Sequence, residues 1–125
     1  FPPVTCSPRP IQAAIPILVG GDTPAAIGRA VRIADGYFPG EGNAERLRRL
    51  IGELRIAAEK HGRDPASIEV NAIFAAQMTD PVAGTEQFAK LGVSRAMIPG
   101  FFFAGPGGLD RLSEFGERVI HAARR

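Results

Sequence analysis

Four short apolar segments alternate along this sequence with four segments of helical periodicity, and this alternation constrains the fold more than any other feature. Strands that alternate with helices favour right-handed βαβ units and one parallel sheet. We therefore predict an α/β fold of four βα units. The predicted strands are residues 15–19, 36–39, 67–75 and 94–100, and the predicted helices are residues 24–34, 43–61, 85–91 and 109–123.

The length of the chain limits the size of this sheet. Four units in 125 residues leave about 31 residues for each, close to the size of one βαβ unit. A complete (β/α)8 barrel takes about 250 residues. The chain is therefore expected to form half of such a barrel or a small open sheet. We divide it into a proline-rich extended arm, residues 1–14, and a single unit of four parallel strands with their helices, residues 15–125.

The composition excludes several classes of function. The net charge of +2 is too small for a nucleic-acid surface. A single cysteine, Cys6, excludes a disulfide framework, and only two histidines, His61 and His121, argue against a metal site. No apolar run approaches the ~20 residues of a membrane span and no secretory signal is evident, so we expect a cytoplasmic protein without membrane or nucleic-acid partners. The start at Phe1 indicates processing or a piece of a longer protein.

A glycine pair that closes the first predicted strand is the most informative segment. Gly20 and Gly21 permit close approach of a ligand to the backbone. Thr23 is a favoured N-cap and Pro24 suits the first helical position, so a helix with free N–H groups should start here. One interpretation is a phosphate site, and the other is a tight turn that needs small residues. Asp22 opposes phosphate binding unless its carboxylate caps the helix and points away.

Residues 16–39, PILVGGDTPAAIGRAVRIADGYFP, resemble a sequence block of the bacterial-luciferase-like flavin-dependent oxidoreductases, a family that includes enzymes dependent on the deazaflavin F420. The resemblance continues through HGRDP at residues 61–65, GTEQ at residues 84–87 and LGVSR at residues 91–95. It covers nearly the whole chain and rests on the order and spacing of these segments rather than on one diagnostic motif.

This resemblance implies a TIM barrel whose last four strands are those of this chain. Family members bind FMN or F420 at the carboxyl ends of the barrel strands, with the phosphate on the loop after the strand that matches residues 15–19. The residues that meet the reactive ring lie mostly on strands that precede these four, so no catalytic residue is predicted. The implied function is the C-terminal portion of a flavin- or F420-dependent oxidoreductase or monooxygenase acting on a small organic substrate. The loop residues implied in cofactor binding are Gly20, Gly21, Asp22, Thr23 and Ala25.

The residues alone leave two other functions open. One is a truncated, non-catalytic remnant that binds a phosphorylated ligand or serves in assembly. The other is a small open-sheet phosphate-binding domain unrelated to luciferases. Whether this chain catalyses a reaction by itself is also left open.

Other residues are weaker candidates for contact with a ligand or a partner. Arg29 is a candidate for phosphate contact, and Asn71 and Gln77 are candidates for substrate contact. Phe101–Phe103 should pack on a partner, a cofactor or the other half of a barrel, because three exposed aromatic side chains are unfavourable in water. Four strands leave two sheet edges unpaired, so we expect a homo-oligomer joined through those edges or the inner sheet face.

Overall fold

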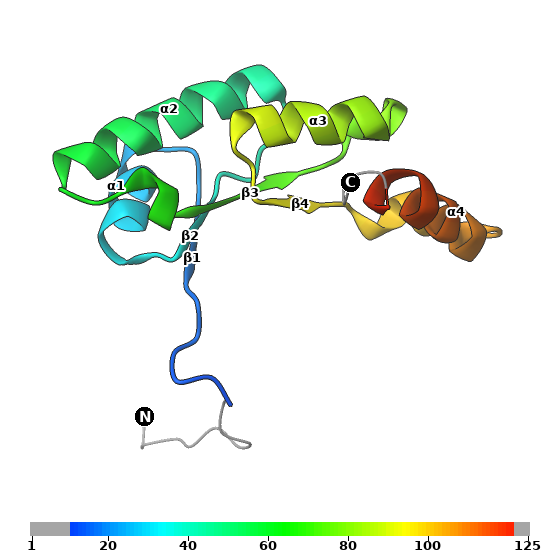
Figure 1. The fold of residues 1–125 in the computed structure, drawn as a ribbon, viewed down its shortest axis with the longest axis horizontal. Coiled ribbons are helices and arrows are strands. Elements are labelled where there is room, and N and C mark those ends of the chain that lie inside the picture. Colours follow the sequence, from blue (N-terminus) through cyan, green and yellow to red (C-terminus); the bar gives the residue numbers. More distant parts are fainter. Residues whose placement is uncertain (1–10, 122–125) are drawn as a thin grey trace.

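Four parallel strands form one sheet in the computed structural model, which describes residues 11–121 (Figure 1). Each strand pairs with the next along the chain, in the order β1-β2-β3-β4. The predicted α/β fold of four βα units is confirmed. Cys6 and most of the predicted arm lie outside the described residues. The strands are β1 (Leu18–Gly20), β2 (Gly36–Phe38), β3 (Glu69–Ile73) and β4 (Arg95–Met97), and the helices are α1 (Pro24–Ile33), α2 (Ala44–Lys60), α3 (Pro81–Leu91) and α4 (Gly108–Phe115).

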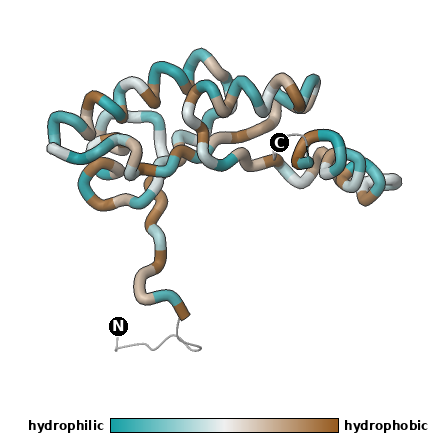
Figure 2. The backbone as a smooth tube through the Cα atoms, in the orientation of Figure 1, coloured by the Kyte–Doolittle hydropathy of each residue, from teal (hydrophilic) through white to brown (hydrophobic). Residues whose placement is uncertain are grey.

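The main core lies between the sheet and the helices α1, α2 and α3. Figure 1 shows α2 and α3 lying over the same face of the sheet. In α2 the buried positions Leu47, Leu50 and Leu54 recur at helical spacing, and brown and teal segments alternate along this helix in Figure 2. These side chains pack with Tyr37 of β2 and with Val70 of β3. No helix within residues 11–121 is both long and apolar enough to cross a membrane.

The first three helices each begin at a polar side chain that accepts hydrogen bonds from the first turn. These caps are Thr23, Asn43 and Asp80. The predicted loop at residues 79–84 and the predicted helix start at Thr85 are wrong. The Asp80 carboxylate accepts a hydrogen bond from the backbone N–H of Ala83 at 3.2 Å, and a proline occupies the first helical position. This cap starts α3 at the end of a short 3-10 turn, earlier than expected.

The first strand is shorter and more exposed than predicted. Ile15 and Ile17 precede β1, with 62% and 51% of their surfaces exposed. The N–H of Ile17 donates to the Asp35 carboxylate at 2.8 Å instead of to a backbone carbonyl of a neighbouring strand. The prediction that this strand is buried on both faces is also wrong, since Leu18 is 44% exposed. β3 and β4 likewise occupy only the middle of their predicted ranges.

The C-terminal part differs from the loop and single helix that were predicted. The predicted loop at residues 101–108 includes a 3-10 turn at Gly100–Phe103. After α4 the chain continues into a π-helical turn at Gly116–Ile120 instead of a longer α-helix. Figure 1 shows α4 beyond β4, at one end of the sheet. Two side chains that were predicted to face inward from the helix at residues 109–123 differ in burial: Val119 is buried, whereas Leu109 is exposed.

The HGRDP segment, residues 61–65, has a structural role that the family resemblance did not predict. Asp64 caps a 3-10 turn at Pro65–Ser67. The Arg63 guanidinium donates to the carbonyl of Val31 at 3.0 Å and to the hydroxyl of Ser67 at 3.0 Å. Arg63 therefore ties the C-terminal end of α1 to the connection that leads into β3.

Candidate functional site

The residues implied in phosphate binding lie together where β1 ends and α1 begins. In parallel α/β sheets, ligands bind outside the carboxyl ends of the strands, and this loop occupies such a position. Four of the five residues are exposed and Gly21 is half-buried, so the loop is open to a ligand. The structure therefore brings together Gly20, Gly21, Asp22, Thr23 and Ala25.

Backbone N–H groups are the main donors that this loop offers. The N–H of Gly21 is bonded to β2, and the hydroxyl of Thr23 accepts from the N–H of Ala26 at 3.2 Å. The N–H groups of Asp22, Thr23 and Ala25 make no hydrogen bond with any other described residue. Free N–H groups at the positive end of a ten-residue helix form a setting suited to an oxyanion.

Gly21 has a conformation that requires glycine, and a buried tyrosine holds it in place. Its φ is +115°, and a Cβ atom at this position would lie 3.0 Å from the Cβ of Ala26. The hydroxyl of Tyr37 donates to the carbonyl of Gly21 at 2.8 Å. Burial raises the pKa of Tyr37 to about 12, with smaller contributions from the carboxylates of Asp22 and Glu53. The hydroxyl therefore stays protonated and keeps donating at neutral pH.

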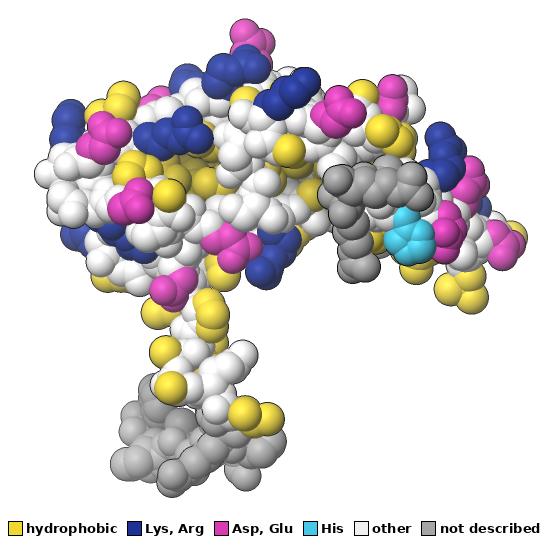
Figure 3. All heavy atoms as spheres, in the orientation of Figure 1, with side chains coloured by type: hydrophobic (Ala, Val, Ile, Leu, Met, Phe, Trp, Pro, Cys, Tyr) yellow, Lys and Arg dark blue, Asp and Glu magenta, His cyan; other side chains and the backbone are white. Residues whose placement is uncertain are grey.

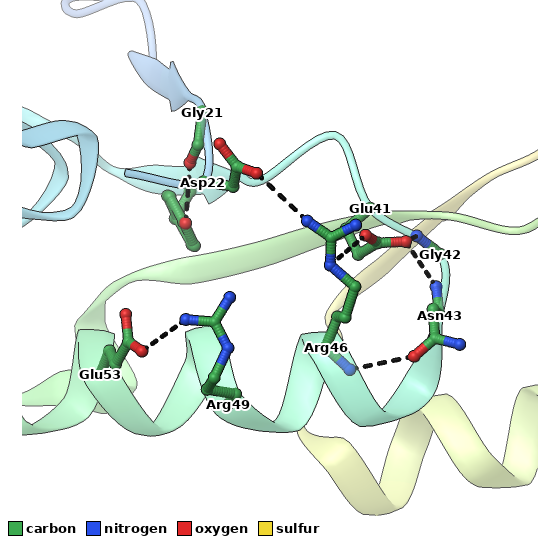
Figure 4. Close-up of polar contacts among 9 residues, drawn as sticks. Gly21, Asp22, Glu41, Gly42, Asn43, Arg46, Arg49 and Glu53 are labelled. Atoms are coloured by element: carbon green, nitrogen blue, oxygen red, sulfur yellow. Dashed lines mark hydrogen bonds and ion pairs between the residues drawn. The ribbon is translucent and has the colours of Figure 1, made fainter. Parts of the chain in front are cut away.

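Asp22 forms an ion pair and does not cap the helix, since Thr23 fills that role. Its carboxylate lies 3.4 Å from the Arg46 guanidinium of α2, and the Nε of Arg46 lies 3.0 Å from the Glu41 carboxylate (Figure 4). One cation between two carboxylates leaves this cluster with one net negative charge. Asp22 was expected to be compatible with phosphate only if its carboxylate capped the helix, and this condition is not met. Pairing with Arg46 offsets the charge of Asp22 only in part, because Glu41 shares the same cation.

Glu41 holds Arg46 in position at the rim of the loop. One oxygen of the Glu41 carboxylate accepts hydrogen bonds from the N–H groups of Asn43 and Gly42, each at 2.8 Å. These hydrogen bonds, with a smaller contribution from Arg46, hold the pKa of Glu41 below its usual value. Arg46 was missed in the sequence because it follows Asp22 by 24 positions and faces it only once β1 and β2 are paired.

The two candidates for substrate contact are buried. Asn71 is fully buried in β3, and its side-chain amide has no hydrogen-bond partner among residues 11–121. The side chain of Gln77 donates to the carbonyl of Gly42 at 2.8 Å and so braces the loop between β2 and α2. Neither side chain is therefore exposed for contact with a substrate at the Gly20–Ala25 loop.

The other single residues lie on helices or at helix ends, and both histidines have local partners. Arg29 is exposed on α1, and the Nδ1 atom of His61 lies 2.9 Å from the carbonyl of Ala57. The Nδ1 atom of His121 lies 3.1 Å from the carboxylate of Glu117 in the π-helical turn. Within the described part of the chain, no three metal-ligating side chains come together.

The aromatic segment after β4 packs mostly within the chain itself. The rings of Phe103 and Phe115 have centroids 5.8 Å apart, and those of Phe101 and Phe102 are 4.6 Å apart. Phe102 and Phe103 are half-buried, whereas Phe101 is exposed. One of the three side chains is therefore left on the surface.

The structure defines a class of fold, in which four parallel strands alternate with helices as in TIM-barrel-like enzymes. The loop between β1 and α1 offers free N–H groups to an anion at the carboxyl end of the sheet. Residues 1–119 match the family model described as luciferase-like monooxygenase. The chain belongs to this family. The unrelated open-sheet alternative is thereby excluded.

The curated relatives that match this chain are longer than it is. Uncharacterised proteins of Mycobacterium bovis and Mycobacterium tuberculosis are each 35% identical over 98 residues, which is 78% of this chain and 32% of the relative. The chain thus spans about a third of the length of these curated relatives. The coenzyme F420 dependent tetrahydromethanopterin reductase from Methanopyrus kandleri has a similar structure, with a TM-score of 0.67, 16% identity and coverage of 86% of this chain and 51% of that chain. At this identity the similarity is one of fold.

Proposed function

We propose that this chain forms the C-terminal portion of a luciferase-like flavin- or F420-dependent oxidoreductase and binds the cofactor phosphate at the Gly20–Ala25 loop. The observation that carries the proposal is the set of free N–H groups where β1 meets α1. Membership of the luciferase-like monooxygenase family supports the cofactor class, and the fold shared with an F420 dependent reductase supports F420 as one of the two candidates. A bound cofactor would supply the hydride or oxygen chemistry on a small organic substrate.

The residues of the loop fit a phosphate group. The N–H groups of Asp22, Thr23 and Ala25 are free to donate, and the Thr23 hydroxyl retains its own proton as a further donor. Tyr37 engages the carbonyl of Gly21, an acceptor that would otherwise repel an anion. Arg46 neutralises one of the two carboxylates at the rim of the loop, so the backbone N–H groups remain the main donors.

The experiment that tests this function is a titration of FMN, F420 and inorganic phosphate into the 125-residue chain and its Gly21→Val variant. The valine side chain would crowd Ala26 and block close approach to the loop. We expect it to weaken binding of all three ligands about tenfold, the scale of one lost hydrogen bond to a charged group.

Gly52→Val is the matched control, because Gly52 lies in α2 with open space around it. It should leave all three affinities unchanged, and thermal unfolding shows whether each variant folds. Equal binding by the wild type and Gly21→Val would place the phosphate elsewhere. Binding of inorganic phosphate but of neither cofactor would contradict the oxidoreductase assignment and favour a non-catalytic phosphate-binding chain.

Replacing Asp22 tests the electrostatics of the same loop. Asp22→Ser removes one negative charge and releases Arg46 from one of its two carboxylates. We expect phosphate binding to tighten by about 1 kcal/mol, the scale of one nearby charge in an exposed setting. The gain should be larger for FMN, a phosphate monoester, than for F420, whose phosphodiester carries less charge.

Glu114→Gln removes an equal charge from an exposed ion pair with Arg118, beyond the opposite end of the sheet, and should leave these affinities unchanged. Isothermal titration calorimetry measures both variants against the wild type. Weaker binding by Asp22→Ser would show that the Asp22 carboxylate contacts another part of the cofactor.

A further inference from the structure

The cation beside the Gly20–Ala25 loop is held by two unequal contacts. The Nε atom of Arg46 lies 3.0 Å from the carboxylate of Glu41, and its Nη2 atom lies 3.4 Å from the carboxylate of Asp22. Figure 4 shows the guanidinium between these two groups. The side chain of Glu41 is 19% exposed and that of Asp22 is 50% exposed, so water competes more strongly for the contact with Asp22. The contact with Asp22 is therefore the one that another anion can replace.

Glu41 is fixed in place by groups other than Arg46. One oxygen of its carboxylate accepts hydrogen bonds from the backbone N–H groups of Gly42 and Asn43, and Arg46 lies against the other oxygen. Its backbone is tied to β3, since its carbonyl accepts a hydrogen bond from the N–H of Ile73 at 2.9 Å. The carboxylate can therefore hold Nε of Arg46 while the Nη atoms change partner.

An anion would be drawn to this loop by groups close to it rather than by a broad positive surface. On the face drawn in Figure 3, the basic and acidic side chains of the described residues are interspersed and do not gather by sign. The net charge of the chain is only +2. Arg46 is in ion-pair contact with a residue of the loop, so it is placed to act at short range.

We propose that Arg46 is a direct ligand of the bound phosphate, that Glu41 positions it, and that Asp22 occupies it until phosphate arrives. This role of Arg46 rests on the proposed function and adds a side-chain ligand to the backbone N–H groups of the loop. A phosphate monoester offers the planar guanidinium two oxygens at once and carries more charge than a carboxylate at neutral pH. It therefore displaces Asp22 from Nη2, and the exposed Asp22 carboxylate returns to water.

The two carboxylates are expected to respond in opposite directions to the loss of their charge. Asp22→Ser removes the group that competes with phosphate for Arg46 and tightens binding. Glu41→Gln removes an equal charge together with the partner of Nε, while the glutamine oxygen can still accept from the N–H groups of Gly42 and Asn43. We expect Glu41→Gln to weaken phosphate binding about threefold, the scale of an exposed ion pair. Repulsion alone would make both substitutions tighten binding.

Substitutions of Arg46 test the ligand itself, by isothermal titration calorimetry with inorganic phosphate and with FMN. Arg46→Gln should weaken binding of both about tenfold, the scale of one lost hydrogen bond to a charged group. Arg46→Lys should recover only part of this loss, because an ammonium group lacks the fork that reaches Glu41 and phosphate together. Arg118→Gln is the matched control, since it removes an equal charge from an exposed ion pair with Glu114 beyond the opposite end of the sheet. It should leave both affinities unchanged, and thermal unfolding shows whether each variant folds.

Carbon-13 NMR of the side-chain carboxylates follows the exchange of partners directly. As inorganic phosphate saturates the wild type, the signal of Asp22 should move toward its position in Arg46→Gln, and the signal of Glu41 should stay in place. Equal affinities of Arg46→Gln and the wild type, or tighter binding by Glu41→Gln, would overturn this role of Arg46. The proposed function would still stand if Gly21→Val weakened binding in the same titrations. A wild type that binds neither phosphate nor FMN overturns both.

Discussion

Replacing Gly42 by alanine is expected to lower the free energy of unfolding by about 2–3 kcal/mol, the scale of overpacking against a rigid neighbour. A Cβ atom at Gly42 would overlap the backbone carbonyl of Ile73 in β3. That carbonyl cannot move freely, because its peptide group carries the N–H of Phe74, which donates to the carbonyl of Met97 at 2.8 Å. The N–H of Ile73 also donates to the carbonyl of Glu41 at 2.9 Å. The loop between β2 and α2 would have to separate from β3. Its separation would also break the hydrogen bond from Gln77 to the carbonyl of Gly42.

The same substitution at Gly52 is the control, with the opposite sign. Gly52 lies inside α2 with nothing near its absent side chain, so alanine there should stabilise the chain by about 0.5–1 kcal/mol. Urea-induced unfolding followed by circular dichroism compares both variants with the wild type. If Gly42→Ala unfolds at the same urea concentration as the wild type, the close contact between this loop and β3 does not exist.

Local pattern was enough to predict the second helix. Leu47, Leu50 and Leu54 recur at helical spacing, and the predicted limits of residues 43–61 enclose α2 closely. Both signals are contained within the segment itself: a side chain that caps the first turn and an apolar stripe along one face. The start of α3 had the same kind of signal in Asp80 and Pro81, and the sequence interpretation overlooked it.

Burial of a strand could not be predicted in this way, because it depends on what lies above and below the sheet. The apolar run at residues 15–19 was interpreted as a strand covered on both faces. In the structure Ile15 and Ile17 precede β1, and Leu18 stays exposed. An apolar run indicates that a segment is stabilised by burial. It does not show which residues bury it.

Some residues of the candidate site could be predicted from local sequence patterns, and others could not. Gly20 to Ala25 are consecutive in sequence, so their grouping at the start of α1 followed from the strand and helix patterns alone. Arg46 and Tyr37 come from other parts of the chain and reach the loop only through the pairing of β1 with β2 and the packing of α2. Sequence spacing carries no signal for such contacts when the strand order is unknown.

Alkaline pH is expected to destabilise the chain through Tyr37, which is fully buried. An unfolded tyrosine ionises near pH 10, whereas burial raises the pKa of Tyr37 to about 12 in the folded chain. Below pH 10 both states keep the proton, so the contribution to stability is fully present. As the pH rises above 10, the unfolded chain releases a proton that the folded chain retains, and stability falls. The loss should reach about 2 kcal/mol near pH 12.

Tyr37→Phe separates this effect from other alkaline changes. The variant should lose about 1 kcal/mol at neutral pH, because the carbonyl of Gly21 loses its hydrogen bond. It should then lose less stability than the wild type as the pH rises from 10 to 12, since it has no phenol to ionise. Tyr37 is the chain's sole tyrosine, so ultraviolet difference absorbance follows its ionisation directly while urea unfolding is measured at each pH. Parallel declines in the two proteins, or ionisation of the folded wild type near pH 10, would show that Tyr37 is not held in a buried hydrogen bond beneath the glycine loop.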